Sequence, residues 1–487
     1  MPQTAIIIGQ RENCRRLERQ LDLLRDRPVT LGWVLTDDDI EADRLDDDAP
    51  TLGAVDQLEA IVARRRPGLA LVSLPAVMNE LITTIRTRLR RLGVPDRFMP
   101  TLQDQLAGVG PRTIPQLDLS ALIDRSPRKC DQQAVRSLIK DKCVLITGAG
   151  GSIGSELARI AATFDPAQLI LIDRSENALF EIDRQIARFA PELARRALLH
   201  DIVEPEATKA HFELVQPDLV FHAAAHKHVP LMEDHPAAAV DNNLFGTKSV
   251  ADAADAVGVE RFVMISTDKA VKPRSIMGMT KRLAELYVQY VGKRSQTRFA
   301  MVRFGNVLGS AGSVLDTWAK QLAEGGPITV TDPAMTRYFM MIPEAAALVM
   351  QSAAFLDASS SAGDVFILDM GQPVRIVDLA RRFIEAYGLC PKLPDDAAAS
   401  ETTGEMRIVF TGARPGEKRH EQLARDPHAL VPTAHPDILV TRLPEVDEHV
   451  IEHMLAELSP QRRSRDRIRV AAAIRELISA ELQPAAA

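Results

Sequence analysis

Short apolar runs alternate with longer amphipathic runs through the first hundred residues of this 487-residue chain. The apolar runs read as strands: AIIIG (5–9), VTLGWVLTDDD (29–39), LALVSLP (69–75) and DRFMP (96–100). The amphipathic runs read as helices: 15–27, 55–66 and 78–93. Strands that alternate with helices in this way indicate a parallel α/β sheet.

The same alternation restarts at CVLITGAGGSIGSELARIAATF (143–164) and continues to about residue 310. After that it breaks into short strands and turns, typical of a substrate-binding subdomain over a nucleotide-binding sheet. A stretch rich in Pro and charge, 124–142, lies between the two alternating units. The fold class is therefore α/β, and the expected organisation is a Rossmann-like domain, a linker, a catalytic domain with a smaller subdomain from about 310, and a helical tail: 1–125, 126–141, 142–443 and 444–487.

Composition narrows the class of protein. Hydrophobic residues make up 46% and charged residues 26%, which is ordinary globular composition. A net charge of -7 argues against a protein that coats nucleic acid. No run approaches the ~18 apolar residues that cross a bilayer, so we expect a cytoplasmic protein. The four cysteines are scattered without a CxxC pair, so neither a zinc site nor a disulfide framework is indicated.

A glycine-rich turn follows the first strand of the second unit. In VLITGAGGSIGSELA the glycines Gly148, Gly151 and Gly154 stand between an apolar strand and a helix. Such glycines permit a tight turn, close approach of backbone N–H groups to a pyrophosphate, and close helix–strand packing. The alternative is a turn that serves packing alone, but the strand and helix on either side favour a dinucleotide site.

Two later strand ends complete this predicted site. QLILID ends at Asp173, about 20 residues after the glycines, where a carboxylate binds the adenosine ribose in NAD-dependent proteins. Arg174 beside it is able to accept a 2′-phosphate, so NADP stays open. Asp201 and Ile202 follow a third strand, where the adenine edge is expected.

The first unit carries no such loop. Only Gly9 follows its first strand, and the bulky Gln10, Arg11 and Glu12 would block a pyrophosphate. We interpret it as a degenerate Rossmann-like domain with a structural or regulatory role.

From about 142 to 423 the chain resembles the extended short-chain dehydrogenase/reductases of bacterial polysaccharide and glycan synthesis, the CapD-like nucleotide-sugar 4,6-dehydratases. The resemblance rests on seven segments: TGAGGSIG, FHAAAHKHVPLMEDHP, NNLFGT, STDKAVKP with MGMTKR, VRFGNVLGSAGSV, MTRYFMMIPEA and RPGEKRHEQL. The first unit resembles the degenerate domain of the long family members. Those members begin with transmembrane helices, which this sequence does not display, so we expect no membrane tethering.

The resemblance implies an NAD-dependent lyase that acts on a UDP-hexose, most often UDP-N-acetylglucosamine. The implied reaction removes water across C5–C6 and leaves a 4-keto-6-deoxy sugar. Long members carry Met at the position of Met277, four residues before Lys281, where other short-chain dehydrogenases have a catalytic Tyr. One departure is Ala311, where an Arg often stands.

The segment STDKAVKP carries an adjacent acid and base, which suit the proton transfers of a dehydration. We assign Asp268 as the acid to the C6 hydroxyl and Lys269 as the base at C5, as the resemblance also suggests. Thr267 would hydrogen-bond the C4 hydroxyl and relay its proton through water, and Lys281 would bind the nicotinamide ribose. For both Asp268 and Lys269 to reach one sugar, the chain must leave the strand at this point. The alternative is a solvated Asp–Lys pair beside a buried Met277.

The full set of candidate positions extends around these residues. The expected cofactor-binding residues are Gly148, Gly151, Ser152, Ile153, Gly154, Asp173, Arg174, Asp201, Ile202, Ala223, Ala224, Ala225 and Lys281. The expected substrate-binding residues are Lys227, Asn243, Asn306, Arg337, Arg414 and Glu417. The motif HAAAHKH holds three histidines but lacks carboxylate or thiolate partners at zinc spacing, so no metal site is expected.

Two other functions stay open at this point. A nucleotide-sugar epimerase, at C5 or C4, would use the same site, although Met277 counts against the usual 4-epimerase chemistry. A non-catalytic protein that senses NAD or a UDP-sugar is the alternative from another class. Its weakness is that a sensor has no need for Asp268 and Lys269 beside a nicotinamide. The expected partners are a UDP-sugar and further copies of the chain in a homo-oligomer, without nucleic acid.

Overall fold

The structure, a computed structural model, describes residues 4–22, 27–36, 50–75, 78–99, 101, 119–123, 128, 130–356, 364–394 and 405–482. The chain divides into two compact units, which are described separately. Unit 1 comprises Met1–Asp118, Gln321–Ile328 and Ala380–Val409. Unit 2 comprises Leu119–Lys320, Thr329–Leu379 and Phe410–Ala487.

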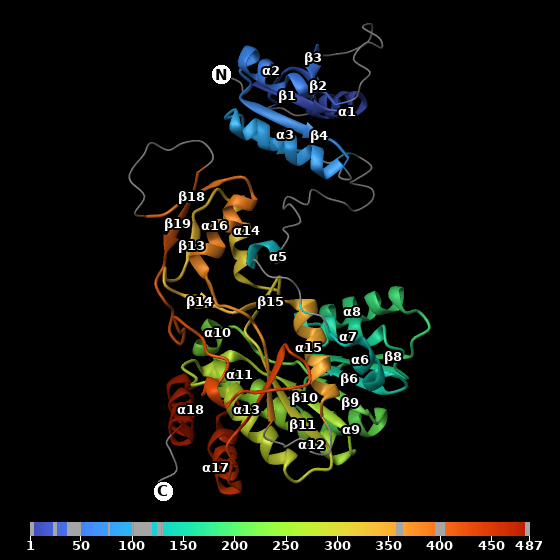
Figure 1. Cartoon of the computed structure of the whole chain (residues 1–487), viewed down its shortest axis with the longest axis vertical. Helices are drawn as coiled ribbons and strands as arrows, with labels where there is room; N and C mark the ends of the chain where they lie inside the picture. Colours follow the sequence, from blue (N-terminus) through green and yellow to red (C-terminus); the bar gives the residue numbers. More distant parts are fainter. Residues whose placement is uncertain are drawn as a thin grey trace. The chain divides into compact units, whose positions relative to one another are not determined.

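The main sheet of unit 1 has five parallel strands in the order β3-β2-β1-β4-β5 (Figure 1). The strands are β1 Thr4–Gly9, β2 Val29–Leu35, β3 Thr51–Ala54, β4 Leu69–Ser73 and β5 Asp96–Phe98. The helices are α1 Arg11–Asp22, α2 Leu58–Arg65 and α3 Asn79–Arg91. Separate clusters of buried residues lie on the two faces of this sheet. The predicted α/β arrangement is thereby confirmed for this unit.

Two details of unit 1 differ from the sequence prediction. Strand β3 was not predicted, because it has only four residues and Gly53 interrupts its apolar pattern. Helix α1 begins at Arg11, four residues before the predicted start, since its first turn is polar and shows no apolar periodicity. The predicted strand ends at 37–39 and at Pro100 lie outside the described residues.

Unit 2 is built on a nine-stranded sheet in the order β20-β21-β16-β11-β10-β9-β6-β7-β8. Its strands are β6 Cys143–Thr147, β7 Gln168–Asp173, β8 Arg195–Leu199, β9 Leu219–His222, β10 Arg261–Ile265, β11 Arg298–Arg303, β16 Asp364–Leu368, β20 Val431–Pro432 and β21 Ile438–Arg442. Pairing is parallel from β16 through β8, while β20 and β21 pair antiparallel. The order reverses beside β6, so the carboxyl ends of β6 and β9 border a crevice where α/β proteins bind ligands.

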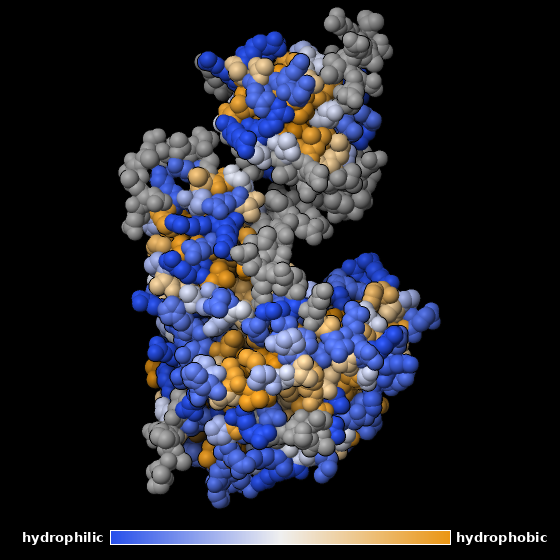
Figure 2. Space-filling view, in the orientation of Figure 1, coloured by the Kyte–Doolittle hydropathy of each residue, from blue (hydrophilic) through white to orange (hydrophobic). Residues whose placement is uncertain are grey.

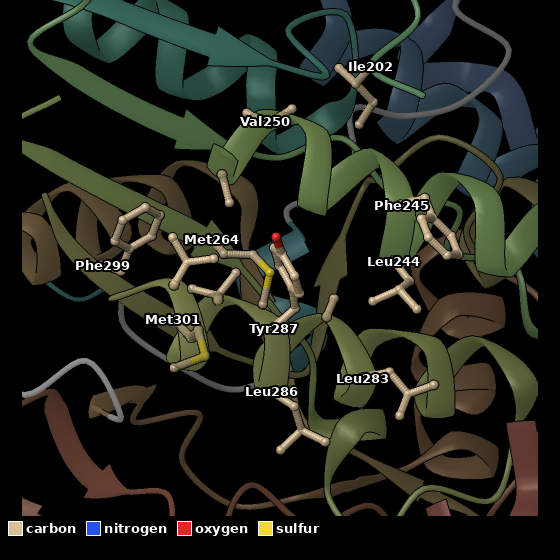
Figure 3. Close-up of a cluster of buried hydrophobic side chains, with 14 of the residues drawn as sticks. Ile202, Leu244, Phe245, Val250, Met264, Leu283, Leu286, Tyr287, Phe299 and Met301 are labelled. Atoms are coloured by element: carbon tan, nitrogen blue, oxygen red, sulfur yellow. The ribbon is translucent and has the colours of Figure 1, made fainter. Parts of the chain in front are cut away.

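Helices cover both faces of this sheet (Figure 1). One face packs against α6 Gln132–Ile139, α7 Ser152–Ala162, α8 Glu176–Phe189 and α15 Ile342–Ala354. The other packs against α9 Pro205–Val215, α12 Thr247–Ala256, α13 Ile276–Gly292, α17 Glu448–Leu458 and α18 Arg467–Leu482. Figure 3 shows part of this second core, with Tyr287 of α13 among Met264, Phe299 and Met301.

Helix α6 lies within the segment 126–141 that was expected to be a linker. Asp131 caps it by accepting hydrogen bonds from Gln133 N and Ala134 N, at 2.9 and 3.1 Å. Its apolar face places Val135 and Ile139 in the core of unit 2. This stretch is therefore a packed element of unit 2.

The remaining elements are shorter, and those within Gln321–Ile328 and Ala380–Val409 belong to unit 1. They are α5 Leu119–Ile123, α10 Val229–Asp234, α11 Pro236–Ala239, the π-helical segment η3 Val240–Gly246, the 3-10 turn η4 Asp268–Ala270, β12 Asn306–Leu308, α14 Val314–Ala323, β13 Ile328–Val330, β14 Thr336–Arg337, β15 Phe339–Met341, β17 Val374–Arg375, α16 Ile376–Ala386, β18 Cys390–Lys392, β19 Glu405–Phe410, and the 3-10 turns η5 Pro427–Ala429 and η6 Ser459–Gln461. Hydrophilic residues occupy most of the face of unit 2 drawn in Figure 2, around a smaller hydrophobic area. Across the described ranges, no helix combines the length and the apolar character that a membrane span requires.

Candidate active site

The loop between β6 and α7 has no room for side chains at Gly148 and Gly154. Gly148 has a φ of +65°, and a Cβ there would lie 2.7 Å from the backbone N of Ala224. A Cβ on Gly154 would lie 2.0 Å from the carbonyl oxygen of Gly148. Gly151 is the N-cap residue of helix α7 and has no side chain that could accept hydrogen bonds from the first N–H groups of the helix. An exposed helix N-terminus of this kind favours a phosphate group.

A cavity of about 150 Å³ lies beside this loop. Nine of the predicted cofactor-binding residues line it: Gly148, Gly151, Asp173, Arg174, Asp201, Ile202, Ala223, Ala224 and Ala225. The Asp173 carboxylate is held in place by the backbone N–H groups of Gly150 and Ser175, at 2.9 and 2.8 Å. Strand ends that are far apart in sequence thus meet at one small pocket, which we call the adenosine cavity.

The glycine loop also borders a second cavity, of about 960 Å³. Its wall contains most of the remaining predicted positions: Ser152, Ile153, Gly154, Lys227, Thr267, Lys269, Met277, Lys281, Asn306, Arg337, Arg414 and Glu417. Gly151, Ala223 and Ala225 line both cavities. We call this larger space the reaction cavity.

The chain leaves strand β10 just before the predicted acid and base. Thr267 is extended, and η4 then turns the backbone, so that Asp268 and Lys269 meet side by side. The Thr267 hydroxyl donates to Asp268 Oδ1 at 2.9 Å and accepts from Lys269 N at 3.3 Å. Lys269 Nζ donates to Asp268 Oδ1 and to Asn306 Oδ1, both at 3.0 Å. The predicted departure from the strand is present, and it gathers these groups at one point.

Asp268 differs from its neighbours in exposure. Its side chain is fully buried and does not line the reaction cavity, whereas Thr267 and Lys269 do. Its Oδ2 atom has no hydrogen-bond partner among the residues that the structure describes. That oxygen lies 3.3 Å from the place where Gly305, a residue of the cavity wall, would carry a Cβ. The carboxylate therefore stands one layer behind the wall, with a glycine beside its free oxygen.

Helix α13 presents Met277 and Lys281, one turn apart, to the reaction cavity. Lys281 Nζ is buried, and no described residue gives it a hydrogen bond. Burial lowers the pKa of Lys281 to about 8, against an opposing effect of Glu285. On neighbouring β9, burial and the nearby Lys281 lower the pKa of His222 to about 3, so this histidine is neutral.

Behind this helix, Glu285 joins the segments that carry the predicted catalytic groups. It accepts hydrogen bonds from the Ser266 hydroxyl at 2.6 Å, from Arg303 at 2.7 and 2.5 Å, and from Arg282 at 3.1 Å. Burial raises its pKa, but Arg303 and Arg282 outweigh that effect and bring the pKa to about 2. Arg282 also pairs with Glu481 of α18. A buried ionic cluster thus ties β10, β11, α13 and α18 together.

Asn243, predicted as a substrate-binding residue that helps to orient Lys281, is not among the residues that line the two cavities. Its amide oxygen accepts from His226 N at 2.7 Å, and its amide nitrogen donates to His226 O at 3.1 Å and to Thr280 Oγ1 at 3.2 Å. The side chain is fully buried within the π-helical segment η3. It holds the loop before Lys227 against the residue that precedes Lys281.

The far wall of the reaction cavity comes from irregular segments. Arg414 and Glu417 form an ion pair at 2.8 Å, and Arg337 donates to the carbonyl groups of Thr336 and Arg419. Sequence reasoning missed several other wall residues, including His226, Gly305, Trp318, Thr331 and Thr411. His226 and Gly305 lie within motifs that the family resemblance rests on, whereas no local pattern marks Trp318, Thr331 or Thr411. Among the residues that the structure describes, no group of three His, Cys, Asp or Glu is arranged to hold a metal ion.

Comparison with known proteins places these features in a family context. A family model described as "Polysaccharide biosynthesis protein" matches residues 144–443. The chain is 41% identical over 424 residues to the probable polysaccharide biosynthesis protein EpsC of Bacillus subtilis, covering 86% of this chain and 68% of that protein. It is 38% identical over 408 residues to the capsular polysaccharide biosynthesis protein CapD of Staphylococcus aureus, covering 82% and 65%. The chain thus spans about two thirds of the length of these relatives.

Two further relatives, which are named for different activities, have the same sequence identity to this chain. Over 289 residues, 58% of this chain and 78% of the relative, the chain is 31% identical to an inverting UDP-N-acetylglucosamine 4,6-dehydratase of Campylobacter jejuni. Over 290 residues, 58% and 77%, it is 31% identical to a UDP-glucose 4-epimerase of Rickettsia canadensis. The X-ray structure of Pen from Bacillus thuringiensis superposes with a TM-score of 0.55 at 31% identity, covering 64% of this chain and 89% of that one.

Proposed function

The chain belongs to the family of polysaccharide biosynthesis proteins, and from that membership we propose that it is an NAD-dependent UDP-sugar 4,6-dehydratase. The proposed substrate is UDP-N-acetylglucosamine or a related UDP-hexose, and the product is a UDP-4-keto-6-deoxy sugar. One observation carries this proposal: Thr267, Asp268 and Lys269 meet beside the same cavity as the glycine loop and Lys281. An acid, a base and a buried cation at one end of a dinucleotide site suit a dehydration that starts from an oxidised sugar.

The described residues fit a dinucleotide. Backbone atoms lie where Gly148 and Gly154 would carry a Cβ, as the tight turn and close helix packing of a dinucleotide loop require, and Gly151 stands at the start of helix α7. Asp173 favours ribose hydroxyls over a 2′-phosphate, and Arg174 is turned to His226 and Asp201, at 3.0 and 3.7 Å. We therefore propose NAD rather than NADP. Its chemistry would be the removal of a hydride from C4 and the return of that hydride to C6.

The absence of a phenol at Met277 leaves the C4 hydroxyl proton without the usual acceptor. Thr267 lies at the cavity wall and donates its own proton to Asp268. We propose that the C4 hydroxyl passes its proton to Thr267 while Thr267 passes one to Asp268. The carboxylate is then protonated, which is the form that an acid needs at the next step.

Elimination then uses both neighbours. Lys269, in its neutral form, takes the C5 proton, which the new C4 ketone makes acidic. Asp268 gives its proton to the C6 hydroxyl, and the C5–C6 double bond forms as water leaves. Because Asp268 lies behind the cavity wall, we assign this transfer to Oδ1, with the Thr267 hydroxyl passing the proton on to the C6 hydroxyl. Lys269 finally returns its proton to C5, so that the proton count closes over one turnover.

Arg337, Arg414 and Glu417 are the proposed contacts of the UDP group. Arginine suits a diphosphate because its planar fork donates two parallel hydrogen bonds. Glu417 would accept from ribose hydroxyls, in place of or beside its ion pair with Arg414. Lys227 donates to the carbonyl oxygen of Ala311 at 2.9 Å, at the wall where the sugar would lie.

The test is incubation of the purified chain with UDP-N-acetylglucosamine and NAD, followed by mass spectrometry. We expect a product lighter by one water, with no net reduction of NAD. Lys269→Ala is the inactive control. A panel of UDP-sugars that all return unchanged in mass, with NAD bound, would instead support a sensor.

A nucleotide-sugar epimerase is the second candidate, since a 4-epimerase matches as closely as a dehydratase. Met277 argues against ordinary C4 epimerisation, which relies on a titratable group at that position. C5 epimerisation would use Lys269 in the same way. Deuterium from solvent entering C5 without loss of water would favour this alternative.

A further inference from the structure

Arg462, in the loop between η6 and α18, contacts two separate segments of unit 2. Its Nε pairs with Asp241 Oδ1 at 2.5 Å, and its Nη2 donates to the carbonyl oxygen of Val203 at 2.9 Å. Its guanidinium lies 4.8 Å from the ring centre of Phe245. One side chain therefore joins the loop after β8 to the π-helical segment η3.

The two joined segments form one wall of the adenosine cavity. Asp201 and Ile202 line it from the first segment, and Asn242 lines it from η3. The two pack closely, because a Cβ on Gly246 would lie 2.8 Å from Ile202 Cδ1. Ile202 and Phe245 belong to one buried cluster, and both are drawn in Figure 3. A change in the spacing of these segments would therefore change the shape of the wall.

We propose that Arg462 is a positioning residue that sets the adenosine end of the cofactor site, an inference that rests on the proposed use of NAD. Arg462 lines neither cavity, so it acts through the segments that do. It also lies beyond residues 144–443, the part of the chain that matches the family. The C-terminal segment thus supplies part of the support for the cofactor site.

The side-chain chemistry explains why an arginine suits this position. A guanidinium donates in two directions at once and stacks on an aromatic face, which a lysine ammonium does not do in the same geometry. The next residue supplies a natural comparison. Arg463 pairs with Glu204 at 3.5 Å, and its side chain is 80% exposed against 26% for Arg462. An exposed pair of that kind contributes little.

The test compares Arg462→Met with Arg463→Met in the full chain, with equilibrium binding of NAD, ADP-ribose and UDP to each. We expect Arg462→Met to weaken NAD and ADP-ribose together by about tenfold. UDP binding should stay unchanged, and Arg463→Met should bind all three ligands as the parent does. Both variants are first checked by their thermal midpoint without ligand.

Asp241→Asn supplies a second variant in case Arg462→Met folds poorly. It should weaken the same two ligands by a smaller factor, and the double variant should lose less than the sum of the single effects. Equal NAD affinity in Arg462→Met and the parent would overturn the inference. So would a parallel loss of UDP, which would indicate general unfolding.

The failure of the proposed function gives a different pattern. A parent chain that binds no NAD removes the inference together with the proposed cofactor. A parent chain that binds NAD but dehydrates no UDP-sugar removes the proposed reaction only. In that case the difference between Arg462→Met and Arg463→Met still decides the inference.

Discussion

Lys281 is a cation placed where water does not solvate it. Its ammonium is buried at the wall of the reaction cavity without a hydrogen-bond partner in the described part of the chain, and burial lowers its pKa to about 8. Burial removes the hydration that stabilises a charged ammonium. A hydrogen bond from Lys281 to an oxygen of a bound ligand would stabilise the charged form again.

The fall of kcat/KM at high pH should depend on the protonation of Lys281. Protonated Lys281 is the form that binds ribose hydroxyls and supports loss of the C4 proton, so kcat/KM should fall as the pH rises through about 8. Lys281→Arg should keep part of the activity and move the limb to higher pH, since a guanidinium stays charged. The measurement is kcat/KM from about pH 6 to about pH 10. An unchanged limb in Lys281→Arg would assign it to another group.

The neighbouring acid and base should be separable by experiment. Asp268→Asn and Lys269→Met should each lower dehydration by about 10²- to 10⁴-fold, the usual contribution of a positioned acid or base. NAD affinity should stay near that of the parent, because neither side chain lines the adenosine cavity. Arg419→Met, at an exposed ion pair with Asp332, is the matched control and should keep full activity. Loss of NAD binding in the two variants would point to a structural role.

At the scale of elements, the site depends on the ends of the strands and on helix α13, which packs against them. The glycine loop joins β6 to α7, η4 follows β10, and α13 lies across both. Glu285 fastens β10, β11 and α13 from behind through Ser266, Arg303 and Arg282. The geometry of the reaction cavity therefore rests on a buried ionic cluster as well as on the sheet.

Removal of the charge of Glu285 should strongly destabilise unit 2. Glu285→Gln leaves Arg303 buried without its partner, and such losses typically cost about 3–5 kcal/mol of unfolding free energy. The pKa of Glu285 is about 2, below its ordinary value of 4.5. Its stabilisation is thus complete above about pH 4.5 and is lost as the pH falls toward 2. Urea unfolding at several pH values should show a smaller acid-induced loss in Glu285→Gln than in the parent, with Glu344→Gln as a control at another buried glutamate.

The glycine loop allows a matched test of close approach. Gly148→Ala should abolish measurable NAD binding, because its Cβ would meet Ala224 N at 2.7 Å. Gly258 has a similar φ of +69°, but a Cβ there would meet no atom of the described residues within 4 Å. Gly258→Ala therefore carries only the backbone strain, roughly 1–2 kcal/mol. Gly258→Ala should be less stable yet bind NAD normally. Equal loss of binding in both would indicate that strain, rather than contact, is responsible.

These elements also show what sequence reasoning is able to reach. The glycine loop, Asp173 and the turn at Asp268 were predictable because each depends on a few consecutive residues. Asn243 was predicted to help orient Lys281, and its hydrogen bond to Thr280 places it against the residue before that lysine, although it lines neither cavity. Arg462 had no local signal at all, since its partners lie more than two hundred residues earlier.

At the scale of the whole molecule, the chain forms two compact units with separate cores. Both cavities described above belong to unit 2. Unit 1 has a Rossmann-like strand order, yet a Cβ at Gly9 would lie 2.2 Å from the carbonyl oxygen of Ser73. The end of β1 in unit 1 is therefore packed against its neighbour.

Calorimetry should separate the two units. We expect two thermal transitions, and NAD at one hundred times its dissociation constant should stabilise only one of them, by about 2.7 kcal/mol. Arg462→Met should reduce that shift, while a change in the core of unit 1, such as Ile7→Ala, should move the other transition. A single transition that shifts as a whole with NAD would show that the units unfold together.

The contact between Arg282 and Glu481 has a consequence for the order of events during synthesis. The two residues are 199 positions apart, and the pair is nearly buried. When the ribosome has already made the glycine loop, Asp268 and Lys269, Glu481 has not yet been made, and Arg282 still lacks this partner. Helix α18 therefore completes the buried ionic cluster only at the end of synthesis. Fragments released before Glu481 is made should be poor enzymes, even though they contain every proposed catalytic group.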